Sequence, residues 1–136
     1  MKYFLDTEFI EGFHKPLFGK RRHFIDLISI GIVAEDGREY YAISSEYDYH
    51  KADNWVKDNV IHKLYFQTIH GDNRNRFDAD KFHKSYGKTN KQIAQEIFNF
   101  CITPAKLNKN GSVTITINDN PDFYAYYADY DWVVFC

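Results

Sequence analysis

The stretch that decides the fold is residues 3–9, YFLDTEF, which places two carboxylates inside an apolar run. Successive side chains of a β-strand point to opposite faces, so Asp6 and Glu8 emerge on one side and Thr7 on the other. Two unpaired anions on a buried strand are costly, and a divalent cation held by oxygen ligands would offset that cost. On an exposed strand the same pair is simply solvated, so the spacing alone leaves both interpretations open.

Composition narrows the class of protein. The chain has 136 residues, 44% of them hydrophobic and 26% charged, as expected for one globular domain. A net charge of −2 argues against a generally basic nucleic-acid-binding protein, but not against an enzyme that holds its substrate through metal ions. Cys101 and Cys136 lack metal-ligand spacing and predict no disulfide framework. Without a signal peptide, transmembrane run or lipidation motif, we expect a cytoplasmic protein with no membrane partner.

A basic loop follows the first strand. Residues 14–23, HKPLFGKRRH, contain Pro and Gly, four Lys or Arg and no acidic residue. The simplest interpretation is a solvated turn. The alternative is a loop that contacts phosphates beside the acidic strand, with Lys20, Arg21 and Arg22 as substrate-binding residues.

Two further strands are expected next. Residues 24–33 predict a second strand and residues 39–44 a third, and the Asp36-Gly37 dipeptide between them is typical of a tight hairpin turn. We therefore predict an antiparallel meander of three strands, in which Ser29 faces the acidic pair and contributes to substrate binding.

Helical signals occupy the middle of the chain. Asp53 predicts the N-cap of a helix over residues 54–66, and residues 89–92, TNKQ, resemble a capping box that starts a second helix. Residues 68–88 between them predict a long polar loop. Its cations alternate with aromatic residues, a mixture that suits single-stranded nucleic acid.

The last third of the chain predicts two strands and a helix start. Residues 112–117 suit an edge strand and residues 122–128 a further strand. Asp129 then predicts an N-cap, which places Asp131 in the first helical turn. Open α/β sheets place their sites at such strand ends, so Asp131 would meet the acidic pair across neighbouring strands.

On these residues the chain resembles the DEDD 3′–5′ exonucleases of the ribonuclease H-like fold. The first motif is FLDTEF (4–9) and the second is ADYD (128–131). The runs DTEFIE (6–11), LISIG (27–31) and AEDGREYYA (34–42) look like the small exoribonuclease group called RNase AS. The basic loop after the first motif and residues 68–88 depart from that group.

The resemblance implies an α/β fold with a ribonuclease H-like mixed sheet flanked by helices. It also implies metal-dependent removal of nucleotides from the 3′ end of single-stranded or 3′-tailed RNA. Asp6, Glu8 and Asp131 would be the catalytic residues and would hold two divalent ions, Mg²⁺ or Mn²⁺. A DNA 3′–5′ exonuclease and a non-catalytic nucleic-acid-binding module remain as alternatives.

The family also has a third motif, in which a His or Tyr general base precedes a fourth Asp. All six His residues of this chain precede Asp131, so none matches that motif. We therefore expect residues 1–136 to form a single exonuclease-like domain that is incomplete at its C-terminal end, lacks its last strand and helix, and is impaired in activity. An incomplete sheet with an exposed apolar edge further predicts self-association as a homodimer.

Overall fold

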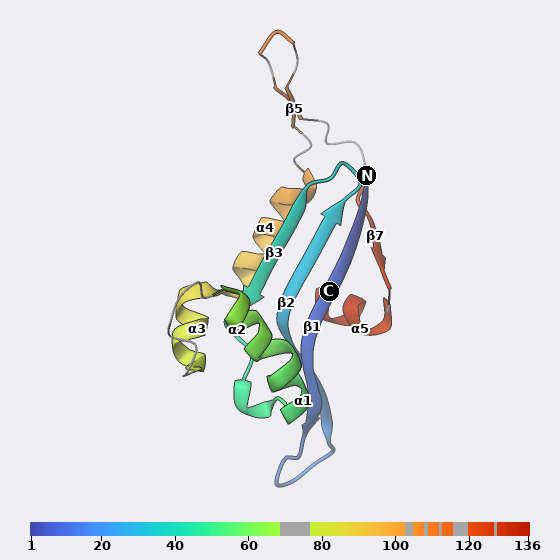
Figure 1. Cartoon of the computed structure of the whole chain (residues 1–136). Helices are drawn as coiled ribbons and strands as arrows, with labels where there is room; N and C mark the ends of the chain where they lie inside the picture. The colour runs from blue at the N-terminus through green and yellow to red at the C-terminus, as the bar shows by residue number, and fades with distance from the viewer. Residues whose placement is uncertain (69–76, 103–104, 108, 112, 116–119, 127) are drawn as a thin grey trace.

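Five strands form one mixed sheet in the computed structural model, in the order β4-β3-β2-β1-β7 (Figure 1). Strands β1 (Lys2–His14), β2 (Arg22–Ala34) and β3 (Glu39–Ser44) are antiparallel neighbours. Strand β4 (Gly87–Lys88) runs parallel to β3, and β7 (Asp122–Ala125) runs parallel to β1. The predicted meander and the ribonuclease H-like α/β class are thereby confirmed.

The structure describes residues 1–68, 77–102, 105–107, 109–111, 113–115, 120–126 and 128–136. No helix in these ranges is long and apolar enough to cross a membrane. Cys101 and Cys136 are free cysteines.

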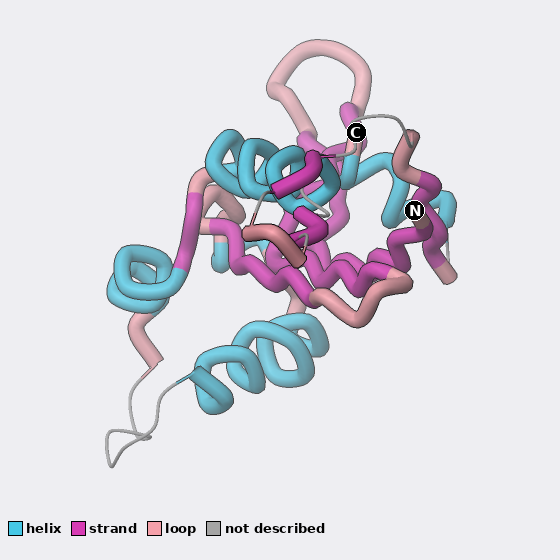
Figure 2. The backbone as a smooth tube through the Cα atoms, turned by 90° about the horizontal axis from the view of Figure 1, so that it is seen from above, coloured by secondary structure: helices cyan, strands magenta, loops and turns pink. Residues whose placement is uncertain are grey.

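Helices cover both faces of the sheet (Figure 2). On one face lies a continuous helical segment made of α1 (Asn54–Val56), the π-helical turn η2 (Lys57–Ile61) and α2 (His62–Thr68), preceded by the short 3₁₀ turn η1 (Tyr49–Lys51). Helix α4 (Asn90–Ile102) covers the opposite face, and α5 (Ala128–Phe135) packs beside β1 and β7. Helix α3 (Ala79–Tyr86) lies next to β4 at the sheet edge.

Each face has its own buried cluster. The cluster under α1, α2 and α3 contains Ile10, Ile28, Ile43, Tyr47, Ala52, Val60, Ile61, Tyr65 and Phe82. The cluster under α4 contains Tyr3, Leu5, Ile30, Ile32, Ala34, Ala42, Ile93 and Ile97. The sheet is thus buried on both sides, although the first cluster reaches β1 only at Ile10 and leaves the N-terminal half of that strand uncovered on its face.

The predicted turn and caps are present. The N–H of Gly37, whose φ is +87°, donates to the carbonyl of Ala34 at 2.9 Å and closes the Asp-Gly turn. The Asp53 carboxylate accepts the N–H of Val56 at 2.8 Å, which caps α1 as expected. At the start of α4, the Thr89 hydroxyl accepts the N–H of Gln92 at 3.2 Å and the Gln92 amide oxygen accepts the N–H of Thr89 at 2.9 Å. This reciprocal pair is a capping box.

The predicted polar loop over residues 68–88 is wrong over its second half, which forms α3 and β4. The Asp78 carboxylate accepts the N–H of Lys81 at 3.1 Å and starts the helix. Phe82 is 1% exposed and packs edge-on against Tyr65 with ring centroids 5.6 Å apart. Burial of this aromatic residue stabilises a helix in a segment of polar composition, so Phe82 is core and not a platform for nucleotides. Residues 69–76 lie outside the described residues.

The last third of the chain forms a small separate sheet and the final helix. Val113–Ile115 form β6, an edge strand as expected, which pairs with β5 (Ala105–Leu107) in a separate two-stranded sheet. Gly111 between them has φ +78°, which suits the tight turn of a local hairpin. Helix α5 begins at Ala128, so Asp129 lies inside its first turn instead of at the N-cap, a position where the helix dipole also favours an acid.

We predict that a partly buried histidine makes stability depend on pH. Burial lowers the pKa of His83, whose Nε2 is enclosed without a hydrogen-bond partner among the residues that the structure describes, and whose ring centroid lies 4.4 Å from that of Tyr47. At this position the unfolded chain therefore takes up a proton more readily than the folded protein does. The contribution of His83 to the free energy of unfolding is fully present above about pH 6.5 and is lost as the pH falls below it. In urea unfolding, His83→Phe should flatten this dependence by up to about 1.4 kcal/mol per pH unit. His50→Gln, at an exposed site, is the control; an equal flattening by both variants would contradict the assignment.

Candidate functional site

Asp6 and Glu8 lie on one face of β1, as the sequence spacing predicts. Both carboxylates are exposed, whereas Leu5 and Thr7 on the opposite face are each 5% exposed. The acidic pair lies on the same side as α1 and α2, just beyond the part of β1 that these helices cover. An anionic pair at the edge of a helical layer is both reachable from solvent and partly shielded from it.

Strand register decides which residues share this face. Glu8 pairs with Ser29, Asp6 pairs with Gly31, and Gly31 pairs in turn with Tyr41 of β3. Because directly opposed residues of neighbouring strands share a face, Ser29 and Tyr41 both lie on the carboxylate side. A Cβ at Gly31 would lie 3.7 Å from the Tyr41 ring, so no side chain separates Asp6 from Tyr41.

A β-bulge follows the acidic pair immediately. Glu8 pairs with Ser29, and Phe9 with Leu27, so Ile28 is the extra residue on β2. A bulge re-aims the side chains around it and bends the strand, and bulges are common beside active sites. Here the bulge buries Ile28 completely against α1 and α2 while Glu8, at the preceding pair, stays exposed.

Asp131 reaches β1 from α5 and is 5% exposed. Its Oδ1 accepts two hydrogen bonds from Thr7, from the backbone N–H at 3.1 Å and from the hydroxyl at 2.6 Å. Strand β7 pairs with β1 only as far as Leu5, opposite Ala125, so the N–H of Thr7 lies beyond the end of β7. The carboxylate of Asp131 takes the place of the missing strand partner and satisfies a buried donor.

Aromatic contacts hold α5 in this position. The rings of Phe9 and Tyr130 stack with centroids 5.5 Å apart and an angle of 16° between their planes. Phe123 of β7 packs against Phe135 at 4.8 Å. These contacts at both ends of the short helix fix its orientation, and Asp131 lies between them.

The three carboxylates repel one another. Burial, and then the negative charge of Asp131, raise the pKa of Asp6. Burial, followed by the charges of Asp6 and Asp131, raises the pKa of Glu8. None of the three forms an ion pair with any Lys, Arg or His in the described part of the chain. A cluster of anions without a cation is an arrangement that a bound cation would stabilise.

The donor chemistry suits a divalent ion, but the ligand set is open. Carboxylate oxygens are the ligands that Mg²⁺ and Mn²⁺ prefer. In the ranges that the structure describes, however, no three His, Cys, Asp or Glu side chains come close enough together to hold one ion. The Oδ1 of Asp131 is occupied by Thr7, whose side chain faces away from Asp6 and Glu8. The geometry brings three acids to one stretch of β1 without closing them around a common point.

The predicted basic residues lie elsewhere. Arg22 pairs with His14 at the last step of the β1–β2 hairpin, and Lys20 and Arg21 belong to its exposed tip. Glu8 and His14 are six positions apart, which is about 20 Å along an extended strand. The structure therefore does not bring Lys20, Arg21 and Arg22 to the acidic pair.

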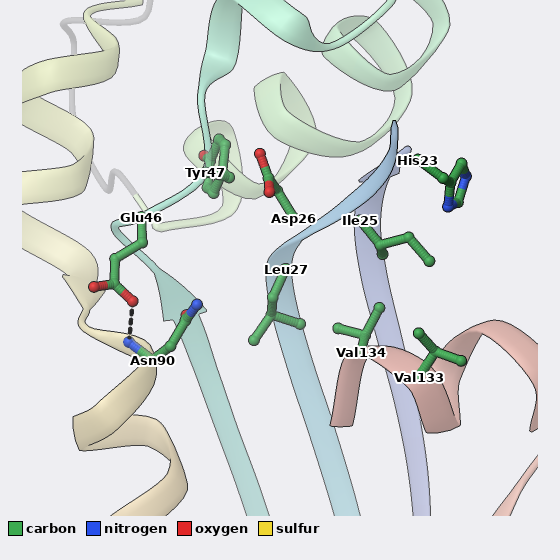
Figure 3. A pocket seen from close by; sticks show the side chains of 9 residues that line it. All are labelled: His23, Ile25, Asp26, Leu27, Glu46, Tyr47, Asn90, Val133 and Val134. Carbon is green, nitrogen blue, oxygen red and sulfur yellow. Dashed lines mark hydrogen bonds between the residues drawn. The ribbon is translucent and has the colours of Figure 1, made fainter. Parts of the chain in front are cut away.

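A separate pocket lies past the bulge (Figure 3). It has a volume of about 290 Å³ and is lined by His23, Ile25, Asp26, Leu27, Glu46, Tyr47, Asn90, Val133 and Val134. The carboxylate of Glu46 accepts the N–H of Asn90 at 2.7 Å, so it serves the start of α4. Asp6, Glu8 and Asp131 are not among the lining residues, and the pocket is distinct from the acidic strand.

Sequence reasoning missed two residues of the site. Alternation places Thr7 on the opposite face, and a buried hydroxyl there needs a hydrogen-bond partner, which signals a polar group packed against it. Tyr41 was not singled out, although counting pairs from the Asp-Gly turn places it opposite Gly31. Burial raises the pKa of Tyr41, a hydrogen bond with Ser29 lowers it, and the charge of Glu8 raises it further. Tyr41 is therefore close enough to both residues to interact with them.

The fold is of the ribonuclease H-like α/β class, and comparison with known proteins bears on part of the chain. No family model matches the chain. Two curated relatives, 3′-5′ exoribonuclease Rv2179c of Mycobacterium tuberculosis strain H37Rv and 3′-5′ exoribonuclease MT2234.1 of strain CDC 1551, are each 55% identical to it over 64 residues. The matched stretch covers 47% of this chain and 33% of each relative. Over that stretch the chain is homologous to these mycobacterial exoribonucleases.

We predict that the acidic pair destabilises the metal-free protein. Folding raises the pKa of Asp6. The contribution of this carboxyl group to the free energy of unfolding is therefore largest at low pH and is lost as the pH rises through the raised pKa. Asp6→Asn should therefore raise Tm at pH 7 in EDTA by a few degrees, about 1–4 °C, and the gain should vanish toward pH 3. Mn²⁺ should raise Tm of the parent protein more than that of the variant. Glu39→Gln is the control, and a variant that unfolds at the parent Tm would refute the repulsion.

We also predict that Thr7 positions Asp131. Thr7→Val removes the hydroxyl donor and leaves a buried carboxylate underbonded, which should lower the free energy of unfolding by about 1.5–3 kcal/mol. Thr7→Ser keeps the hydroxyl and should cost less than half as much. Urea denaturation of both variants measures the difference. Equal losses for Val and Ser would assign the effect to packing and not to the hydrogen bond.

Proposed function

We propose that this chain carries the catalytic region of a metal-dependent 3′–5′ exoribonuclease that shortens single-stranded or 3′-tailed RNA. The observation that carries the proposal is the convergence of Asp6, Glu8 and Asp131 on one stretch of β1, where Asp131 raises the pKa of both other carboxyl groups. Partial homology to proteins named 3′-5′ exoribonuclease supports both the reaction and the choice of RNA.

Asp6, Glu8 and Asp131 would hold the divalent ions, two Mg²⁺ or two Mn²⁺. Bound at such a site, divalent ions lower the pKa of an attacking water and stabilise the leaving oxygen of a phosphodiester. The raised pKa of Asp6 and Glu8 supports this role, since a cation would restore the charged state that the folded protein disfavours. Thr7 would act as a positioning residue, because it holds Oδ1 of Asp131 and leaves Oδ2 for a ligand.

Neighbouring side chains offer contacts to the substrate. Ser29 lies opposite Glu8 but is only 2% exposed, so it would act through its hydrogen bond with Tyr41. The exposed phenol of Tyr41 can donate a hydrogen bond to phosphate or ribose oxygens. One residue pair further along the same face, the half-exposed rings of Phe4 and Tyr124 stack with centroids 5.5 Å apart. Such a surface suits a nucleobase, because every base can stack on an aromatic ring whatever its identity.

The open ligand set favours a second candidate function. If the described acids do not close around an ion, the same face would bind RNA without cleaving it, as a non-catalytic nucleic-acid-binding module. Hydrolysis separates the two functions. RNA and DNA oligonucleotides of one sequence separate an exoribonuclease from a DNA 3′–5′ exonuclease, since the 2′-hydroxyl is the difference between them.

We predict metal-dependent shortening of RNA from its 3′ end. A 5′-labelled, 3′-tailed RNA incubated with the protein and Mn²⁺ should give a ladder of shorter products, and EDTA should abolish it. Asp6→Ala removes a proposed ligand and should slow shortening by about 100-fold or more, since loss of even an outer partner of a metal ligand costs 10–100-fold. Glu39→Gln, on β3 and away from the acidic pair, is the matched control.

Two results would change the proposal. Shortening that persists at full rate in Asp6→Ala would refute the assigned role of the acidic pair. RNA binding without cleavage in Mg²⁺ and in Mn²⁺ would instead support the binding module.

A further inference from the structure

The β1–β2 hairpin extends beyond the rest of the sheet as an arm, defined here as residues 13–23. Strand β3 pairs with β2 only between Val33 and Ser29, so past Ser29 the two long strands continue as a two-stranded ribbon. Figure 1 shows the tip at the end of the molecule opposite the N-terminus, beyond α1. Every residue of the arm is exposed, so none of its side chains is needed for the core.

Positive charge is concentrated in the arm. It holds Lys15, Lys20, Arg21 and Arg22, and no Asp or Glu occurs between Gly12 and Ile25. The whole chain has 17 Lys and Arg against 19 Asp and Glu, so without these four the remainder has 13 basic against 19 acidic residues. None of the four forms an ion pair in the described part of the chain. The arm is a free cationic surface on an otherwise acidic protein.

Large apolar side chains accompany these cations. Leu17 is 94% and Phe18 88% exposed at the tip, where Gly19, with φ +116°, closes the turn. Large side chains that stay exposed bury no apolar area when the chain folds, and they bury it only when another molecule binds them. A hollow of about 470 Å³ beside Phe18 is lined by His14, Lys15, Pro16, Phe18, Gly19, Lys20 and Arg22. An aromatic ring flanked by cations is the composition that binds single-stranded nucleic acid, through stacking and phosphate contacts.

We propose that the arm is a second nucleic-acid contact, which binds the backbone and a base of single-stranded RNA upstream of the 3′ end. The same two strands carry the acidic pair and the arm, so an RNA chain held at one can continue to the other. About 20 Å along β1 separates Glu8 from His14, which corresponds to about six stacked nucleotides at 3.4 Å each. The position of the RNA 3′ end rests on the proposed function, whereas binding to the arm does not.

Binding without metal tests the arm apart from catalysis. We would measure fluorescence anisotropy of a 5′-labelled RNA of about 20 nucleotides in EDTA, over a range of salt, for the triple variant Lys20→Gln, Arg21→Gln, Arg22→Gln. Its affinity should fall at least 10-fold. The slope of log K against log salt should become shallower by about 2, since each cation contributes about 0.7 on single strands. The matched control, Lys63→Gln, Lys81→Gln, Lys84→Gln, changes the net charge equally on exposed helix positions and should alter both quantities far less.

A second variant tests stacking alone. Phe18→Ser should weaken binding of the long RNA by about 5-fold or more without changing the salt slope, because the ring contributes no charge. Circular dichroism verifies that both arm variants fold. For a labelled RNA of about five nucleotides, the affinities of the arm variants and of the parent should differ far less than they do for the long RNA.

Three outcomes would overturn the proposal. They are equal affinity and slope for the arm triple and its control, equal loss on short and long RNA, and tighter binding of the parent to phosphatidylserine vesicles than to RNA. Loss of cleavage in Asp6→Ala with arm-dependent binding intact would concern only the acidic site. Loss of arm-dependent binding with cleavage intact would concern only the arm.

Discussion

The hydrogen bonds that Thr7 donates to Asp131 join the sheet to the candidate site. Strand β7 stops at Ala125, and the carboxylate of Asp131 satisfies the next free N–H of β1. The same contact fixes the first turns of α5 against the strand that carries Asp6 and Glu8. One pair of hydrogen bonds thus ends a strand pairing, orients a helix and gathers three negative charges.

The electrostatic repulsion among those three charges falls on a part of the fold that can tolerate it. Thr7 is enclosed under α5, so the contact to Asp131 is shielded from water, whereas Asp6 and Glu8 face an uncovered part of the sheet. The bulge at Ile28 separates this uncovered part from the section of the hairpin that packs on α1 and α2. On the same two strands, carboxylates are therefore exposed on one side of the bulge and apolar side chains are buried on the other.

Local rules predicted much of this arrangement, and long-range contacts account for the rest. Alternation placed Asp6 and Glu8 on one face, the Asp36-Gly37 turn set the hairpin, and Thr89 with Gln92 marked the start of α4. Helix α3 was missed because its stability comes from Phe82 packing on Tyr65, a contact that polar composition conceals. The bond from Thr7 to Asp131 spans 124 positions and exists only because β7 ends where it does. No local pattern in the chain encodes that distance.

The uneven distribution of charge separates cations from acids along the two longest strands of the sheet. Cations lie at the tip of the arm, and uncompensated acids lie about 20 Å away on the same strands. A polyanion that approaches by diffusion is attracted to one end and repelled by the other, so it experiences a torque before any contact forms. Within a Debye length of about 10 Å at 0.1 M salt this torque sets the orientation of encounter, and higher salt removes it.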